Sequence, residues 1–331
     1  TMGDATGCGP EIIVKSLAQK EFYQSSRLFV IGDAKIMQRA VGIVGSSLKV
    51  RKIDAVAGAG NEPGVIDVLD FDNLPLDLPF ATVDARAGKA AYEYVAKGVE
   101  LAQAGQIDAI VTAPLHKEAL SAAGAPYSLY PGHTELLQAV AAEHLGVPVA
   151  ELPVRMMLAN DELRTVLVSI HVSLRDAIES VTASNILQTL RITHQSVGAA
   201  LQKTVRIGVA GLNPHAGEGG LFGREEIEAI APAIAQARAE GIDARGPFAP
   251  DTVFMRGRGF KEFDVVVAMY HDQGLIPVKY LGVEQGVNVT LGLPFVRTSP
   301  DHGTAFDIAG SGRADASSLL AAVRMARRLR R

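Results

Sequence analysis

Residues 265–274 read Val-Val-Val-Ala-Met-Tyr-His-Asp-Gln-Gly, and this stretch decides the fold class. Its first half, Val265–Met269, is a short apolar, β-branched run without strict polar alternation, as in strands covered on both faces. Polar residues follow at once, beginning near His271. In open α/β sheets, ligands bind beyond the carboxyl ends of the strands. The stretch therefore predicts a buried strand that leads into a functional site.

Working outward, four other segments have the same apolar character: Leu28–Ile31, Ala109–Thr112, Thr165–Ser169 and Val205–Ala210. Ala/Leu/Glu-rich stretches of helical length lie between the predicted strands: Gly88–Ala104, Ser184–Gln202 and Arg224–Glu240. Ser184 is the expected N-cap of the second helix, and Gly105 the expected C-cap of the first. The stretch 58–79 mixes Gly, Asn, Asp and Pro and is expected to be irregular. This alternation predicts an α/β protein with a largely parallel sheet.

The bulk composition excludes several classes of protein. With 331 residues the chain exceeds the ~250–300 that one core supports, so two domains are expected, with a change near residues 130–150. A net charge of -4 and 5% aromatic residues argue against nucleic-acid binding. Cys8 is the one cysteine, so no internal disulfide is expected, and its Gly-rich surroundings predict a turn filler.

The start and the hydropathy of the chain predict a cytoplasmic protein. No apolar run approaches the ~18 residues that a membrane span needs, and no signal-peptide pattern opens the sequence. Thr1-Met2-Gly3-Asp4 has the character of a strand end entering a turn, so we expect a few residues to precede it.

Three histidines follow three of the predicted strands closely: His171, His215 and His271. Imidazole suits zinc, cobalt and other first-row divalent ions, and three protein ligands leave a position open for substrate. The residues alone leave two interpretations open, a three-histidine metal site or three separate core and capping histidines.

Two further features suit an anionic ligand. In Tyr130–Glu135, a Pro-Gly turn precedes His133 and Thr134 at the start of a predicted helix, and a helix N-terminus favours phosphate or carboxylate. The alternative is a capping turn with Thr134 as the N-cap. Lys279 and Arg297 lie in apolar surroundings, and a buried cation needs an anionic partner. That partner is either a ligand or an internal Asp or Glu.

Neither common nucleotide-binding fingerprint is present. The glycines of Gly3–Pro10 do not have the G-x-G-x-x-G order of a Rossmann motif, and no P-loop occurs. A dinucleotide would have to bind elsewhere.

A series of motifs, in order from residue 1 to about residue 320, resembles the 4-hydroxythreonine-4-phosphate dehydrogenase family. The motifs are Gly3-Asp4, Gly7-Cys-Gly-Pro-Glu11, Ala113-Pro-Leu-His-Lys-Glu118, Pro131-Gly-His-Thr-Glu135, Asn213-Pro-His-Ala-Gly-Glu218, Ala249-Pro-Asp-Thr252 and Tyr270-His-Asp-Gln-Gly274. The resemblance implies a two-domain α/β/α fold with a mixed, largely parallel sheet, similar to isocitrate and isopropylmalate dehydrogenases. The expected domains are 1–130 with 300–331, and 131–299 with the metal ligands and dimer contacts, with the active site in the cleft between them.

The resemblance also implies roles for individual residues. It makes His171, His215 and His271 the metal ligands. It makes His133, Thr134, Lys279, Asn288 and Arg297 the substrate contacts. It further implies a homodimer in which the partner subunit helps to complete each metal site.

A second resemblance concerns the cofactor. Asp301–Gly310 is similar to the H-G-[ST]-A-x-D-I-A-G loop that holds the adenosine end of NAD(P) in isocitrate and isopropylmalate dehydrogenases. The residues assigned to the cofactor are His302, Gly303, Thr304, Ala305 and Asp307. The alternative is a Gly-rich turn that opens a final helix.

The implied activity is NAD-dependent (or NADP-dependent) oxidation, with decarboxylation, of 4-phosphooxy-L-threonine in pyridoxal phosphate biosynthesis. One divalent ion per site, zinc, magnesium or cobalt, would polarise the substrate. Lys279 is the candidate proton carrier. Asp272 either orients His271 or faces solvent.

One departure from the family keeps alternatives open. Ala5-Thr6-Gly7 stands where the family usually has Pro-Ala-Gly, near the expected mouth of the site. Close relatives oxidise 4-phospho-D-threonate or 4-phospho-D-erythronate in sugar-acid catabolism, and another oxidises a dicarboxylated cyclohexadiene diol. A metal-dependent hydrolase or lyase, or a binding protein without catalysis, are the remaining alternatives.

Overall fold

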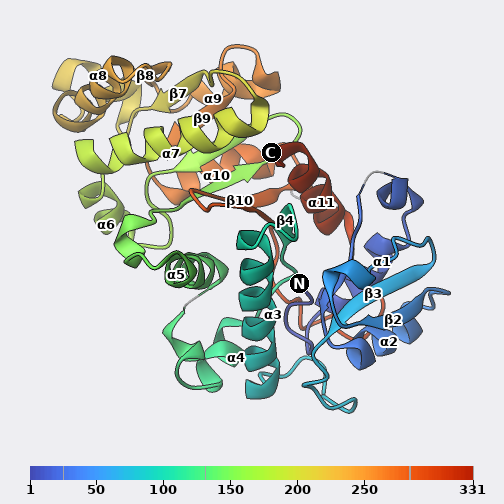
Figure 1. The fold of residues 1–331 in the computed structure, drawn as a ribbon. Helices are drawn as coiled ribbons and strands as arrows, with labels where there is room; N and C mark the ends of the chain where they lie inside the picture. Colours follow the sequence, from blue (N-terminus) through green and yellow to red (C-terminus); the bar gives the residue numbers. More distant parts are fainter. Residues whose placement is uncertain (25, 131, 283–284, 331) are drawn as a thin grey trace. The chain divides into compact units, whose positions relative to one another are not determined.

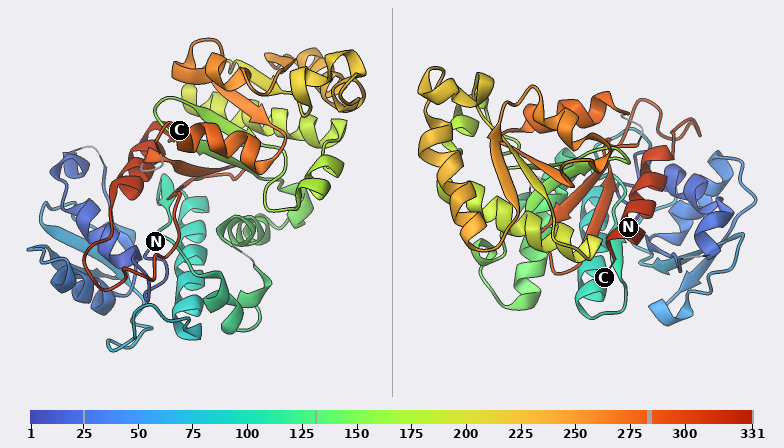
Figure 2. Two further views of the ribbon diagram at one scale, coloured as in Figure 1. Left: turned by 180° about the vertical axis from the view of Figure 1, so that it is seen from behind. Right: turned by 90° about the horizontal axis from the view of Figure 1, so that it is seen from above.

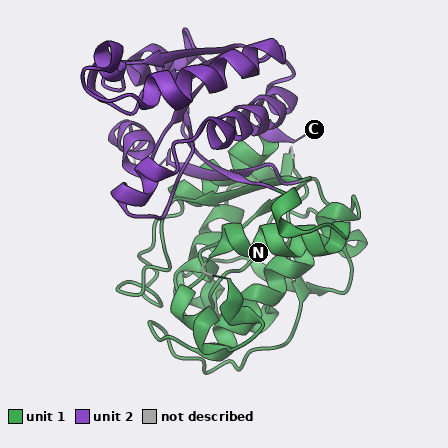
Figure 3. Ribbon diagram, turned by 90° about the vertical axis from the view of Figure 1, so that its left-hand side faces the viewer, with its two compact units in different colours: residues 1–152, 294–327 green, residues 153–293, 328–331 purple. Residues whose placement is uncertain are grey.

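The computed structural model describes residues 1–24, 26–130, 132–282 and 285–330 (Figure 1). The chain divides into two compact units, shown in green and purple in Figure 3. Unit 1 is Thr1–Leu152 with Pro294–Arg327, and unit 2 is Pro153–Leu293 with a few residues from Arg328 onward. None of the helices that the described residues form is long and apolar enough to cross a membrane.

Unit 1 contains two groups of parallel strands. β1 (Val30–Gly32), β3 (Val65–Asp70) and β2 (Lys49–Ile53) form a sheet in that order, and β4 (Ala109–Val111) pairs with β11 (Val296–Pro300). The helices are α1 (Gly9–Leu17), α2 (Ala34–Ile43), α3 (Ala85–Gln103), α4 (Lys117–Ala122), α5 (His133–Leu145) and α11 (Ser317–Leu329). Buried side chains from α1, α2, α3 and β3 share one core.

The boundaries between the units differ from the predicted ones, 130/131 and 299/300. Helix α5 belongs to unit 1, because Gln103 of α3 donates a hydrogen bond to the Ala141 carbonyl of α5 at 3.1 Å. Strand β11 also belongs to unit 1, because it pairs with β4 from Val296 onward. Both contacts are tertiary, and the local sequence gives no sign of them.

Unit 2 is built on a mixed sheet. Its strands lie in the order β10 (Val287–Leu291), β5 (Arg155–Ala159), β6 (Arg164–Leu167), β9 (Val265–Ala268), β7 (Ile207–Ala210) and β8 (Ala244–Phe248). The pairs from β6 to β8 are parallel, whereas β5 is antiparallel to both of its neighbours. The helices are α6 (Leu174–Glu179), α7 (Ala183–Leu201), α8 (Ala231–Ala239), α9 (Val253–Gly257) and α10 (His271–Tyr280).

Helices cover both faces of this sheet (Figure 2). Successive side chains of a strand point to opposite faces. In β5, Arg155 donates a hydrogen bond to Thr189 of α7, whereas Leu158 packs in one core cluster with Leu275 and Val278 of α10. The prediction of an α/β protein with a largely parallel, mixed sheet is therefore confirmed.

Two local predictions are wrong. The stretch 58–79, expected to be irregular, contains β3, whose Asp67 is 2% exposed and accepts hydrogen bonds from the Arg51 guanidinium of β2. This internal ion pair allows charged residues in a buried strand. The N-cap of α7 is Thr182, which accepts a hydrogen bond from the Asn185 backbone, and not Ser184.

Candidate active site

Three neighbouring parallel strands of unit 2 bring the predicted metal ligands to one edge of the sheet. β9 lies between β6 and β7 and is parallel to both. His171 follows β6, His215 follows β7, and His271 is the first residue of α10, directly after β9. Because the carboxyl ends of parallel strands share an edge, the three histidines start from adjacent positions.

Two of these histidines lie together. The ring centroids of His171 and His271 are 5.7 Å apart, with 45° between the ring planes. Both rings line a depression of about 260 Å³ with Val172, Leu174 and Tyr270 among its other residues. Within the described parts of the chain, no three His, Cys, Asp or Glu side chains form a group that could hold a metal ion. His215 therefore does not complete a ligand set with the other two inside one subunit.

Asp272 has an orienting contact with His271. Its carboxylate Oδ1 lies 2.7 Å from Nδ1 of the His271 ring, which leaves Nε2 available to a metal. Carboxylates in this position fix the tautomer and orientation of a ligand histidine. The Asp272 side chain is also exposed, so both predicted alternatives describe part of its environment.

His215 lies on an unusual turn. His215, Ala216, Gly217, Glu218 and Gly219 all have positive φ, between 43° and 80°. The left-handed conformation costs roughly 1–2 kcal/mol for each residue that has a Cβ atom. Three of the five residues, His215, Ala216 and Glu218, have one. Backbone strain of this kind persists only where the surrounding structure imposes it, and it is concentrated at functional sites.

A buried carboxylate supports this turn. Glu226 is 3% exposed, and its Oε1 accepts hydrogen bonds from the backbone N–H groups of Leu212 and Asn213, each at 2.7 Å. Its Oε2 accepts a third from Nδ2 of Asn213 at 2.9 Å. Gln273 of α10 links the two strand ends, since its Oε1 accepts from the Met269 N–H and its Nε2 donates to the Gly211 carbonyl.

The other predicted groups of unit 2 lie on α10 and β10. Lys279 is half-buried in the last turn of α10, the helix that His271 begins. Asn288 is in β10, and its Oδ1 atom is buried without a hydrogen-bond partner among the described residues. A buried amide oxygen without a partner costs free energy, so it is suited to accept a hydrogen bond from a ligand.

In unit 1, Arg297 is a buried cation. It lies in β11, is 2% exposed, and donates a hydrogen bond from Nη2 to Oγ1 of Thr112 at 2.7 Å. Burial lowers the pKa of its guanidinium to about 9, and the nearby Glu135 carboxylate opposes the shift. The group still carries its charge at neutral pH, so it favours an anion beside it.

His133 is the first residue of α5, and Gly132 rather than Thr134 is the N-cap. Desolvation lowers the pKa of His133 well below 6.5, and the charge of Arg297 adds to this effect. Its Nε2 is buried and has no hydrogen-bond partner among the described residues. Unit 1 therefore presents a neutral imidazole and a buried cation, with Thr134 next in the helix.

The predicted cofactor residues form an irregular segment held by α1. The Thr304 carbonyl accepts from the Cys8 N–H at 2.8 Å. Further along, Glu11, which is 1% exposed, accepts from the N–H groups of Gly310 (2.6 Å) and Gly312 (2.7 Å). Lys15 donates to the Gly312 carbonyl at 2.7 Å. The final helix, α11, begins only at Ser317, so the segment is not simply the turn that opens it.

Two side chains, His116 and Cys8, lie near this segment. The His116 ring stacks on Phe306, with centroids 4.5 Å apart and 13° between the planes. Burial raises the pKa of the Cys8 thiol to about 11, so this cysteine is a protonated turn residue at neutral pH, as predicted.

Thr6, which lies where the sequence departs from the family motif, is buried. Its hydroxyl lies 2.7 Å from Asp4 Oδ1 and 2.9 Å from the Thr82 carbonyl.

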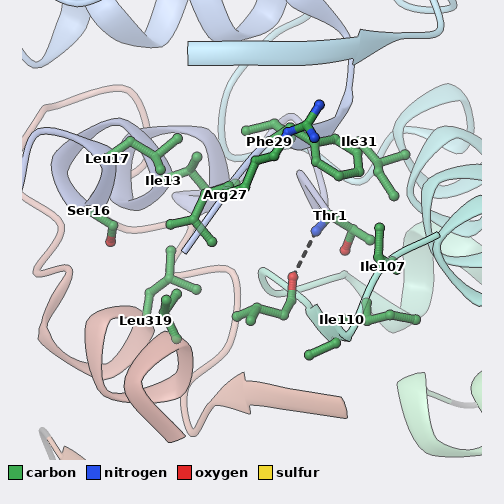
Figure 4. A pocket seen from close by; sticks show the side chains of 15 residues that line it. Thr1, Ile13, Ser16, Leu17, Arg27, Phe29, Ile31, Ile107, Ile110 and Leu319 are labelled. Atoms are coloured by element: carbon green, nitrogen blue, oxygen red, sulfur yellow. Dashed lines mark hydrogen bonds between the residues drawn. The ribbon is translucent and has the colours of Figure 1, made fainter. Parts of the chain in front are cut away.

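An apolar pocket of about 130 Å³ in unit 1 contains none of the predicted site residues (Figure 4). Ile13, Leu17 and Ile110 are among its lining residues. At one side the amino group of Thr1 donates to the Val111 carbonyl at 2.7 Å, and Met2 N–H donates to Ile31. Residues 1–2 thus bond to both β1 and β4, as a strand end would. Arg27 also lines the pocket, but its guanidinium donates to the backbone carbonyls of Ala59, Val56 and Ala57.

Sequence reasoning did not single out Glu11, Lys15, Glu226 or Gln273. Each of these side chains bonds to backbone groups that are distant in the sequence or one helical turn away, so no spacing of residue types predicts the contact. The one available signal is that Glu11 and Gln273 fall inside the motifs that carry the family resemblance.

Comparison with known proteins agrees with these observations. Residues 24–326 match the family model described as pyridoxal phosphate biosynthetic protein PdxA. A 4-hydroxythreonine-4-phosphate dehydrogenase of Beijerinckia indica subsp. indica is 54% identical over 100% of this chain and 94% of its own length. A D-threonate 4-phosphate dehydrogenase of Cupriavidus necator is 51% identical over 98% of this chain and 94% of its own length. The crystal structure of a 4-hydroxythreonine-4-phosphate dehydrogenase from Burkholderia phymatum is 49% identical, covers 99% of this chain and 96% of its own, and has a TM-score of 0.87.

The fold and these relatives define an oxidoreductase of mixed α/β architecture. The chain belongs to the PdxA family.

Proposed function

We propose that this protein oxidises and decarboxylates 4-phosphooxy-L-threonine (4-hydroxythreonine 4-phosphate), using NAD and a divalent metal ion, in pyridoxal phosphate biosynthesis. The observation that carries the proposal is the buried Arg297 guanidinium beside the neutral His133 ring. A buried cation favours anions: Glu135 is one nearby anion, and the substrates named for both relatives carry a phosphate, which the same guanidinium would bind. The dehydrogenase names of the relatives support the reaction type.

The metal would be held by His171, His215 and His271. The donor chemistry fits zinc, cobalt or another divalent ion, because His171 and His271 lie together and Asp272 occupies Nδ1 of His271. When bound, the metal would act as a Lewis acid on the substrate hydroxyl, and NAD or NADP would accept the hydride.

The remaining residues would bind and orient the substrate. Arg297, His133 and Thr134 would hold the phosphate or carboxylate, with Arg297 supplying the charge and His133 a neutral N–H donor. The Asn288 amide would bind a substrate hydroxyl through its buried oxygen. Lys279 would move the proton, because a lysine amino group at the site can serve as a general acid or base.

The active form would be a homodimer. Within the described residues His171 and His271 lie together without His215, and this supports a third ligand from a second copy. The segments after these two histidines expose apolar pairs at a spacing of four residues, Leu174 with Ile178 on α6 and Ile276 with Tyr280 on α10. Apolar groups clustered in this way mark a protein–protein interface.

The cofactor would bind at residues 302–307, with His302, Gly303, Thr304, Ala305 and Asp307 as its contacts. These residues form an irregular segment that is exposed at His302, Gly303 and Asp307, and Glu11 of α1 holds the adjoining residues by accepting hydrogen bonds from the Gly310 and Gly312 N–H groups. A fixed backbone lowers the entropy that binding would otherwise cost.

D-threonate 4-phosphate is the second candidate substrate, because a D-threonate 4-phosphate dehydrogenase is 51% identical to this chain. The departure at Thr6 does not favour it, because the Thr6 hydroxyl already has hydrogen-bond partners within the protein, Asp4 and the Thr82 carbonyl. The choice between the two depends on which substrate reacts.

The test is NADH formation with 4-phosphooxy-L-threonine, D-threonate 4-phosphate and D-erythronate 4-phosphate, each with and without added Zn²⁺, Mg²⁺ or Co²⁺. We expect metal-dependent NADH formation with 4-phosphooxy-L-threonine, and none from a His271→Ala variant. Preferential turnover of either sugar acid would move the protein to the second candidate. Metal binding without turnover of any of the three would support a hydrolase or a non-phosphorylated diol substrate.

A further inference from the structure

The left-handed turn at 215–219 is stabilised by residues outside the turn, and these residues do not contact the predicted metal ligands. The turn is part of a short helical segment, Pro214–Gly220, and the bonds at its ends run from the N–H groups of Ala216, Leu221 and Phe222 to the carbonyls of Asn213, Glu218 and Gly217. A turn with three non-glycine residues at positive φ does not keep this conformation by itself. The structure that imposes it lies in the following segment.

Glu226 is the residue that imposes this conformation. It stands at the start of a wide helical turn, Glu226–Ile230, and its carboxylate takes all three of its hydrogen bonds from Leu212 and Asn213. These two residues connect β7 to the turn. Three N–H donors satisfy the buried charge, so the carboxylate and the connection fix each other.

The contact also extends to the turn itself. A Cβ atom added at Gly217 would lie 2.7 Å from Oε2 of Glu226, closer than real Cβ contacts. Gly217 is thus required both by its φ of 80° and by the carboxylate packed against it. By contrast, a Cβ atom at Gly219, φ 66°, would meet nothing within 4 Å.

We propose that Glu226 is a positioning residue for the metal site: it holds the left-handed turn so that the exposed His215 ring is presented as a ligand. The proposal rests on the proposed function, because it takes His215 as a metal ligand. Groups that orient a ligand in this way commonly change metal affinity by about 10–100-fold when they are removed.

The experiment is calorimetric titration of the full-length protein with Co²⁺, using Glu226→Gln, His215→Ala and the double variant. The amide nitrogen of Gln cannot accept an N–H bond, so Glu226→Gln should weaken Co²⁺ binding about tenfold or more and alter the visible spectrum of bound Co²⁺. In the His215→Ala background the same substitution should cause no further loss, because Glu226 acts through His215. Asp264→Asn is the matched control, since it also removes a buried carboxylate from unit 2 and should leave the affinity unchanged.

A gentler pair of variants tests the same point if Glu226→Gln does not fold. Gly217→Ala should weaken Co²⁺ binding, whereas Gly219→Ala, in the same turn and also at positive φ, should not. Equal effects of the two would overturn the inference.

The outcomes separate the two proposals. If His215→Ala weakens Co²⁺ binding and Glu226→Gln does not, the ligand assignment stands and the role of Glu226 is wrong. If His215→Ala binds Co²⁺ like the wild type, both are wrong. Additive losses in the double variant, or an equal loss in Asp264→Asn, would show that Glu226 acts on general stability only.

Discussion

The His171 and His271 rings lie 5.7 Å apart at the ends of two adjacent parallel strands, and no third ligand group joins them within the described chain. This arrangement allows a test of whether the metal site is shared between two subunits. If the partner subunit supplies His215, two inactive subunits can complement each other.

We therefore expect His171→Ala and His215→Ala to be inactive separately and to regain activity when they are mixed. In a mixed dimer one site combines both substitutions, and the other has intact His171 and His215. The measurement is NADH formation after the two variants are unfolded together and refolded. If one subunit supplied all three ligands, the mixture would remain inactive.

The pKa of His133 should rise when an anion binds. Desolvation and the Arg297 charge keep this pKa well below 6.5, so the ring is neutral at pH 7 in the free protein. A phosphate dianion offsets the cation and stabilises the protonated ring, which raises the pKa. Histidine-ring NMR with and without inorganic phosphate would show the shift. Arg297→Met should raise the pKa without any phosphate, and the ring of His144, which is exposed and has no role in the proposed site, serves as the reference.

Glu11→Gln should raise the KM for NAD roughly tenfold and leave the KM for the phosphorylated substrate near its original value. The substitution removes one of two charge-assisted bonds to the backbone beyond the proposed cofactor residues. Steady-state kinetics with each substrate varied in turn gives both constants. Glu21→Gln is the control, because Glu21 pairs on the surface with Arg324 and does not contact that backbone. A change in both constants would contradict a role confined to the cofactor.

Asp264→Asn should lower the free energy of unfolding by about 3 kcal/mol at neutral pH. Burial would raise the pKa of Asp264, but hydrogen bonds from Arg206 and Lys203 outweigh burial and hold the pKa well below its usual range. A carboxylate with a depressed pKa stabilises the fold above its unfolded pKa of ~3.9, and this contribution is lost as the pH falls below that value.

Urea unfolding at pH 7 and pH 3 measures this effect, and the difference between Asp264→Asn and the wild type should shrink at the lower pH. Asp243→Asn, which breaks a partly exposed pair with Arg245, should change the stability by less than ~1 kcal/mol. A difference that does not depend on pH would point to packing as the cause.

The sequence predicted best where a single local signal dominated. The β-branched run at 265–269 predicted β9, and the histidines after three such runs were placed at one sheet edge because parallel neighbours must end together. Prediction failed where tertiary contacts overrode local pattern. β2 and β3 carry charges that an isolated strand would not bury, and the Arg51–Asp67 and Lys52–Asp70 pairs between the two strands explain them.

The same limit applies to the candidate site. The resemblance indicated the histidines, but neither the left-handed turn under His215 nor the Glu226 carboxylate that supports it has a sequence signature. Thr134 had the residue type of an N-cap, yet α5 begins two residues earlier than that N-cap would place it, directly after Gly132. A cap is decided by backbone geometry, and several residue types satisfy the same pattern.

Unit 1 is assembled from two distant parts of the chain, and this has a consequence for synthesis on the ribosome. Strand β4 pairs with β11, and the side chains of Glu11 and Lys15 bond to the backbone of residues 310–314. Unit 2 is almost entirely one continuous stretch, from 153 to 293. Unit 2 can therefore finish folding on the ribosome while the first 152 residues still lack the C-terminal residues that complete their core. The N-terminal half is the section most in need of chaperone protection during translation.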